Sequence, residues 1–112
     1  MLTFALLTKL RLDIQNRPKT ILELGDDVER LISQRCPTIK WLANYAAFGP
    51  YDYLDIFEVS VPEDALKAAA ILRAYGIASV ELWPLTSWNS YRKIIKDLEL
   101  GEPKLLGRRV AS

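Results

Sequence analysis

Two consecutive apolar and aromatic runs, residues 39–48 and 51–60, meet at Gly49-Pro50 near the middle of the chain. Glycine takes the positive φ that a type II′ turn requires, and proline suits the next position, so the pattern predicts a β-hairpin with a two-residue loop. A hairpin with apolar side chains on both faces must be covered by other parts of the chain or by a partner. This feature restricts the fold to arrangements built around an antiparallel sheet.

The loop length decides which residues of the two predicted strands lie opposite each other. Counting outward from the turn, one face carries the opposing pairs Ala46 and Tyr53, Asn44 and Asp55, and Leu42 and Phe57. The other face then carries Trp41, Ala43, Tyr45, Asp52, Leu54 and Ile56. Because Asn44 and Asp55 are polar, we expect their face to be the one that helices leave open.

Before the hairpin, residues 3–10 are almost all apolar and predict a strand. Asn16 is a suitable cap for a short helix with Pro18 in its first turn, and Gly25 is expected to end or kink that helix. A further helix then runs to Pro37, with Val28 among the residues of its apolar stripe.

After the hairpin, Pro62 and two acidic residues open a helix that runs to about Tyr75 and that Gly76 ends. Its predicted packing stripe consists of small and apolar residues, Leu66, Ala69, Ala70 and Leu72. Residues 77–83 predict a strand that Pro84 ends, and residues 87–98 predict an amphipathic helix capped by Thr86 or Ser87.

The predicted order is β-α-β-β-α-β-α, and its first six elements follow the ferredoxin-like arrangement. We therefore expect an α+β fold with a four-stranded antiparallel sheet, both central helices on one face and an extra C-terminal helix. A chain of 112 residues with 50% hydrophobic content suits one such domain. The uncovered sheet face predicts a partner, and a two-fold homodimer is the simplest one.

Composition excludes several classes of protein. The net charge of +1 argues against a nucleic-acid binder, and no run approaches the length of a membrane span. The chain has no histidine and one cysteine, so histidine-containing triads, intrachain disulfides and the usual zinc sites are excluded. We expect a cytoplasmic protein with no metal, no cofactor, and no nucleic-acid or membrane partner.

The hairpin also carries a motif. Gly49-Pro-Tyr51-Asp52-Tyr53, leading into an apolar strand that ends near Glu58, resembles the signature of the GYD-domain family. The likeness covers about residues 2–98, although segment 15–25 does not align well and Pro50 replaces a residue that is usually polar. It predicts a GYD-like domain over residues 1–100 and a basic tail over residues 101–112.

The resemblance implies a ferredoxin-like protomer of the dimeric α/β-barrel superfamily, in which two sheets pack face to face and leave cavities lined by strand residues. It also implies a family whose members are functionally uncharacterised, and it makes Gly49, Tyr51 and Asp52 the family-motif residues.

Two local constellations have a chemical and a structural interpretation. Tyr51 and Asp52 either contact a small substrate at a cavity mouth or form ordinary turn and packing contacts. Asn44 and Asp55 either contact a ligand or form a cross-strand polar pair without function. The residues expected to line a cavity are Lys9, Asn44, Tyr53, Asp55 and Phe57.

Other residues favour structural interpretations. The aromatic residues Trp41, Tyr45, Trp83 and Trp88 form either a wall for an organic ligand or core and interface contacts. Cys36 has no histidine to activate it and is expected to be a small, half-buried hydrophobe. Arg108 and Arg109 are expected to lie in a solvated tail.

Three classes of function follow. The first is a homodimeric module, possible higher oligomers included, that binds a small organic molecule or interacts with a partner. The second is a cofactor-independent oxygenase or isomerase that acts on a small organic substrate in the barrel cavity. The third is a structural subunit of a larger assembly.

Overall fold

The structure, a computed structural model, describes residues 1–15, 17–75 and 78–98. Its strands are β1 (Leu2–Leu10), β2 (Lys40–Ala46), β3 (Tyr53–Val59) and β4 (Ala78–Leu85). Its helices are α1 (Leu12–Gln15), α2 (Pro18–Arg35), α3 (Pro62–Ala74) and α4 (Trp88–Asp97). The predictions for Asn16, Gly76 and the tail with Arg108 and Arg109 lie outside the described residues.

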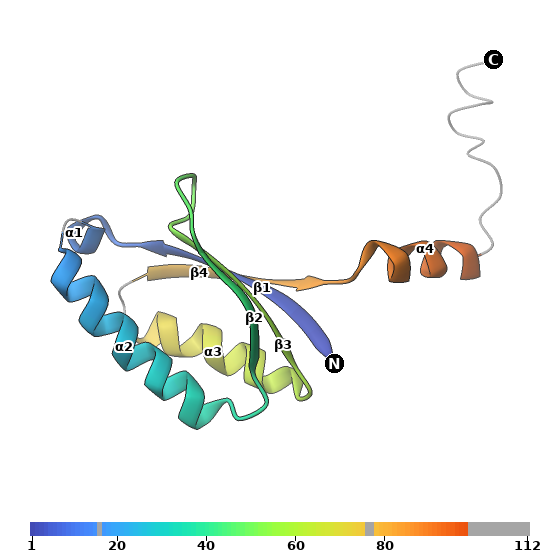
Figure 1. Ribbon diagram of the computed structural model, residues 1–112, viewed down its shortest axis with the longest axis horizontal. Coiled ribbons are helices and arrows are strands. Elements are labelled where there is room, and N and C mark those ends of the chain that lie inside the picture. The colour runs from blue at the N-terminus through green and yellow to red at the C-terminus, as the bar shows by residue number, and fades with distance from the viewer. Residues whose placement is uncertain (16, 76–77, 99–112) are drawn as a thin grey trace, which may run out of the picture.

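The four strands form one antiparallel sheet in the order β2-β3-β1-β4, and α2 and α3 lie on the same face of it (Figure 1). The α+β class and the ferredoxin-like arrangement are therefore confirmed. The additional helix α4 follows β4, as expected, and Figure 1 shows it projecting beyond the end of the sheet.

The core lies between the sheet and its helices. Phe57, Val59 and Leu6 are almost completely buried there. The α3 residues that pack onto them are Ala65, Ala68 and Leu72, because small side chains let the helix approach the sheet closely. The predicted α3 stripe is wrong at two positions, since Leu66 is 63% exposed and Ala70 is also exposed, whereas Ala65 and Ala68 are buried.

Helix α2 is continuous from Pro18 to Arg35, so the prediction that Gly25 ends a helix is wrong. Pro18 lies in the first turn, where a missing N–H is harmless. Val28 and Ile32 are the buried residues of α2, and their packing outweighs the weak helix propensity of one glycine. The Cys36 amide closes the helix by donating to the Ile32 carbonyl, 2.8 Å away.

The hairpin register is as predicted at Asn44, which lies opposite Asp55, and at Ala46, which lies opposite Tyr53. The loop is longer than predicted, because the strands stop at Ala46 and Tyr53 and the Ala47 amide donates to the Asp52 carbonyl at 2.8 Å. Two residues are added on each side of the turn, so the register is unchanged. The φ of Gly49 lies outside the left-handed range that a type II′ turn requires, so the prediction of that turn is wrong.

A β-bulge in β2 changes the pairing beyond Asn44. The register shifts between Trp41 and Ala43, so that Trp41, and not Leu42, lies opposite Phe57. The extra residue moves the Trp41 ring to the helix-covered face, where it meets Phe57 edge to face at a centroid distance of 5.4 Å. Leu42 is left 48% exposed.

Strand β4 continues through Pro84, which lies opposite Phe4, although Pro84 was predicted to end the strand. The difference follows from position: β4 is an edge strand, and proline is tolerated where its missing N–H faces away from the ladder.

None of the described helices lies on the other face of the sheet (Figure 1). Strand alternation and pairing assign to this open face Ala5, Leu7, Ala43, Tyr45, Leu54, Ile56, Glu81, Trp83 and Leu85. Several are large and exposed: Tyr45 by 58%, Trp83 by 45% and Leu85 by 39%. Within the part of the chain that the structure describes, no helix has the length and apolarity to span a membrane.

Candidate functional site

A pocket of about 450 Å³ lies between the sheet and α2. Its helical side is mostly apolar, with the charged residue Glu29 of α2 at one end, and its apolar residues are Ile14, Ile21, Leu24, Val28, Ile32 and Leu72. Gly25 also lines it, and a Cβ built on Gly25 would meet nothing within 4 Å. The absence of a side chain at this position therefore keeps part of the pocket open.

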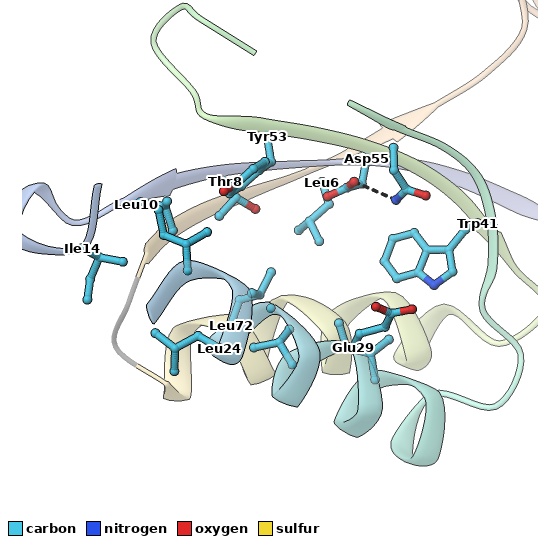
Figure 2. A pocket seen from close by; sticks show the side chains of 15 residues that line it. Leu6, Thr8, Leu10, Ile14, Leu24, Glu29, Trp41, Tyr53, Asp55 and Leu72 are labelled. Atoms are coloured by element: carbon cyan, nitrogen blue, oxygen red, sulfur yellow. Dashed lines mark hydrogen bonds between the residues drawn. The ribbon is translucent and has the colours of Figure 1, made fainter. Parts of the chain in front are cut away.

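The sheet side of the pocket holds most of its polar groups (Figure 2). Asn44 donates from Nδ2 to Oδ1 of Asp55 at 2.7 Å, and Tyr53 and Thr8 lie along the same floor. Trp41 forms one end wall near Glu29. A largely apolar cavity with a few converging polar groups is the usual form of a small-molecule site.

The environment changes the acidity of two of these groups. Partial burial raises the pKa of the Asp55 carboxyl above its usual value of 3.8, and the hydrogen bond from Asn44 opposes this only in part. Partial burial also raises the pKa of the Tyr53 hydroxyl, with the negative charges of Asp52 and Asp55 acting in the same direction. Asp55 is thereby the strongest candidate in the pocket to accept a proton or a hydrogen bond.

Three of the five predicted cavity residues, Asn44, Tyr53 and Asp55, line this pocket together. Phe57 shares their face but is completely buried in the core, stacked with Phe4 at a centroid distance of 5.9 Å. Lys9 is exposed and, by strand alternation, belongs to the opposite face.

The expected position of Asn44 and Asp55 on the open face is wrong, since they face α2. The two residues were assigned to the open face because they are polar, and a sheet face covered by helices normally excludes polar side chains. Here the space below Asn44 and Asp55 is a pocket instead of packed side chains, so polar groups remain accessible.

The motif residues have structural partners. The Asp52 carboxylate accepts the Leu10 amide at 2.7 Å, and the Asp52 amide donates to the Thr8 carbonyl at 2.8 Å, which fixes the hairpin to β1. The Tyr51 hydroxyl donates to Glu81. Gly49 is exposed in the loop. None of these three motif residues lines the pocket.

The aromatic residues do not form one wall. Trp41 lines the pocket, whereas Tyr45 and Trp83 lie on the open face and Trp88 lies on α4. Trp83 donates to the Glu81 carboxylate at 3.0 Å. Cys36 is fully buried, more completely than the half-buried position that the sequence predicted, and burial raises the pKa of its thiol.

Sequence reasoning missed Thr8 and Gly25 as pocket residues. Thr8 could have been found, since it is a polar residue in a nearly continuous apolar strand, and it is only 4% exposed. Trp41 was one of four aromatic candidates for a ligand wall, but its position on the pocket face depends on the bulge and could not be predicted. Gly25 was interpreted as a helix end, although a glycine inside a helix also marks a place where a side chain would fill needed space.

Comparison with known proteins gives one positive finding. No curated protein matches this chain. The family model of the GYD domain matches residues 7–95, which include both sides of the pocket and the hairpin motif. The chain therefore belongs to the GYD domain family.

Proposed function

We propose that this protein is a homodimeric module that binds a small, largely apolar organic molecule in the pocket between the sheet and α2. The observation that carries the proposal is the combination of apolar helical walls with the Asn44–Asp55 pair on the floor. A ligand with an apolar body and one hydroxyl or amine group would bury the body against α2 and donate to Asp55.

The homodimer is supported by the open sheet face. Tyr45 is exposed there beside Leu54, and Trp83 and Leu85 are exposed on the opposite edge strand, where Trp83 lies beside Ala5. Contiguous apolar surface on a sheet marks an interaction site, and the same face on a second copy is self-complementary under a two-fold axis.

The binding proposal is tested with a pocket-filling variant. Gly25→Leu places a side chain in space that is empty, so it should fill the pocket without a clash. Ser33→Leu is the matched control, because it adds leucine at an exposed position of the same helix. Native mass spectrometry then detects retained small molecules, and anilinonaphthalene sulfonate serves as an added apolar probe.

We expect Gly25→Leu to lose the retained mass and to bind the probe at least about tenfold more weakly than the wild type. Ser33→Leu should bind as the wild type does. Equal binding by all three proteins would contradict the pocket as the binding site.

A second candidate, a cofactor-independent oxygenase or isomerase, is favoured by one observation. The Asp55 carboxyl, with its raised pKa, lies with Tyr53 in the same pocket and is suited to accept a proton from a bound substrate. If the protein is such an enzyme, Asp55→Asn should abolish turnover of a substrate that still binds. Turnover that survives both Asp55→Asn and Tyr53→Phe would exclude this pair as the proton-transfer groups.

A further inference from the structure

Helix α4 has an apolar face that no described part of its own chain covers. No residue of α4 is buried, and Figure 1 shows the helix beyond the end of the sheet. The face is formed by Trp88, Tyr91, Ile94, Ile95 and Leu98, of which Trp88 is 69% and Leu98 59% exposed. Its helical form is secured locally, because the Ser87 hydroxyl accepts the Ser90 amide at 3.0 Å.

One flank of this apolar face is basic. Arg92 and Lys96 are one turn apart and border the stripe, and both are exposed. Neither has an ion pair with another described residue. The flank therefore offers two unpaired positive charges beside an apolar surface.

Helix α2 offers the complementary arrangement. Its exposed residues include Leu22, which is 70% exposed, followed at helical spacing by Asp26 and Glu29. Glu29 also lines the end of the pocket near Trp41. Neither carboxylate has an ion pair with another described residue, whereas Asp27 is paired with Arg30 at 2.6 Å. Asp26 and Glu29 are about 5–6 Å apart at Cβ, a spacing similar to that of Arg92 and Lys96.

These two surfaces cannot meet within one chain, because α2 and α4 lie at opposite ends of the molecule (Figure 1). We propose that α4 is an assembly arm that docks on α2 of a second copy of this chain. Leu22 then packs against the apolar face of α4, and Asp26 and Glu29 pair with Arg92 and Lys96. The contact goes beyond the proposed function, because it requires no bound ligand and, of its residues, only Glu29 also lines the pocket.

The first test locates the contact. Isotope-labelled and unlabelled protein are mixed, treated with a carbodiimide that joins carboxylates to amines at contact distance, and digested for mass spectrometry. We expect cross-linked peptides that join Lys96 to Asp26 or Glu29 and that combine one labelled with one unlabelled partner. A wild-type chain that is monomeric at every concentration, or cross-links that never combine the two labels, would overturn the proposal.

The second test exchanges the charges. Arg92→Glu with Lys96→Glu should weaken self-association about tenfold in sedimentation equilibrium, because attraction becomes repulsion. Adding Asp26→Lys and Glu29→Lys to the same chain should restore the dissociation constant to within about threefold of the wild type. Arg35→Glu with Arg73→Glu makes the same change in net charge at exposed positions elsewhere and is the control.

If the control weakens association as much as the α4 variant does, the effect is one of net charge, and the proposed contact is wrong. If the four-substitution chain associates no better than the α4 variant, the predicted pairing of charges is also wrong. Neither result depends on ligand binding, so failure here is distinguishable from failure of the pocket proposal.

Discussion

Asp52 shows how a single residue of the family motif can have an architectural role. Its carboxylate and its amide both bind the end of β1. The carboxylate accepts the amide of Leu10, which lies 42 residues earlier in the sequence. Tyr51 makes one exposed hydrogen bond, to Glu81. Asp52 and Tyr51 of the motif therefore attach the hairpin to the sheet, and the residues that line the pocket are others.

We predict that Asp52→Ala lowers the free energy of unfolding by about 2 kcal/mol, because the partly buried Leu10 amide loses a charged acceptor. Tyr51→Phe should cost less than about 0.5 kcal/mol. Urea denaturation measures both. Asp52→Asn retains an acceptor oxygen and serves as the control, which should recover part of the loss; equal losses for Asp52→Ala and Tyr51→Phe would contradict this assignment.

The ionised Asp55 carboxyl is predicted to lower the stability of the fold, whereas the Asp52 carboxylate raises it. The pKa of Asp55 is raised in the folded state, so the ionised carboxyl opposes folding above that pKa, and the penalty disappears as pH falls toward 3.8. Asp55→Asn keeps an acceptor for Asn44 and should unfold with a free energy equal to that of the wild type, or higher by up to about 1 kcal/mol, at pH 7.

Thermal unfolding of the wild type and Asp55→Asn across the acidic range measures this effect. The difference in the free energy of unfolding between the wild type and Asp55→Asn should become smaller as pH falls. A variant that is clearly less stable than the wild type at neutral pH would mean that the carboxylate stabilises the fold.

At the scale of the elements, α2 combines a buried stripe, the exposed carboxylates of Asp26 and Glu29, and a glycine that lines the pocket. We predict that Gly25→Ala stabilises the protein by about 0.5–1 kcal/mol, because alanine favours the helix and its Cβ meets nothing within 4 Å. Chemical denaturation tests this. A loss of stability would show that the position does not tolerate even one methyl group.

The loop between α2 and β2 is held by a second carboxylate. Asp64, which is 3% exposed in the first turn of α3, accepts both the amide and the hydroxyl of Thr38 at 3.0 and 2.6 Å. These hydrogen bonds lower the pKa of Asp64 below 3.8, so its stabilising effect is fully present above that value and is lost as pH falls through the lower, folded-state pKa.

We therefore expect the stability difference between the wild type and Asp64→Asn to be largest at neutral pH and to vanish in strong acid. Unfolding midpoints in urea from neutral pH down to pH 2 measure it. A difference that is independent of pH would assign the effect of the substitution to packing.

Much of the element order was predictable, because periodicity and caps are local signals. Ser87, Pro62 and the apolar run of β1 each indicated an element that is present. The bulge was not predictable, since adding Leu42 to β2 depends on how the whole sheet twists over its helices. The pocket was not predictable for a related reason: Asn44 and Asp55 pair as expected, but the space beneath them depends on where α2 lies.

At the scale of the whole molecule, one chain has a covered sheet face with a pocket, an open sheet face and a projecting helix. We predict that Trp83→Glu on the open face shifts a homodimer toward monomer, because the substitution places a charge in the apolar surface that the partner would bury. Leu66→Glu, at a 63% exposed position of α3, is the control and should leave the mass unchanged.

Sedimentation velocity measures this prediction, with circular dichroism to verify that both variants fold. If Trp83→Glu remains as associated as the wild type while its fold is intact, the open face is not the dimer interface.

The three tryptophans are distributed over these three surfaces: Trp41 in the pocket wall, Trp83 on the open face and Trp88 on α4. They lie in different surroundings, beside Phe57, beside the Glu81 carboxylate and 5.9 Å from the Tyr91 ring. Variants that retain one tryptophan each would give three separate fluorescence signals. The chain thus contains its own optical probes, which distinguish ligand entry, sheet pairing and docking of α4 without any attached dye.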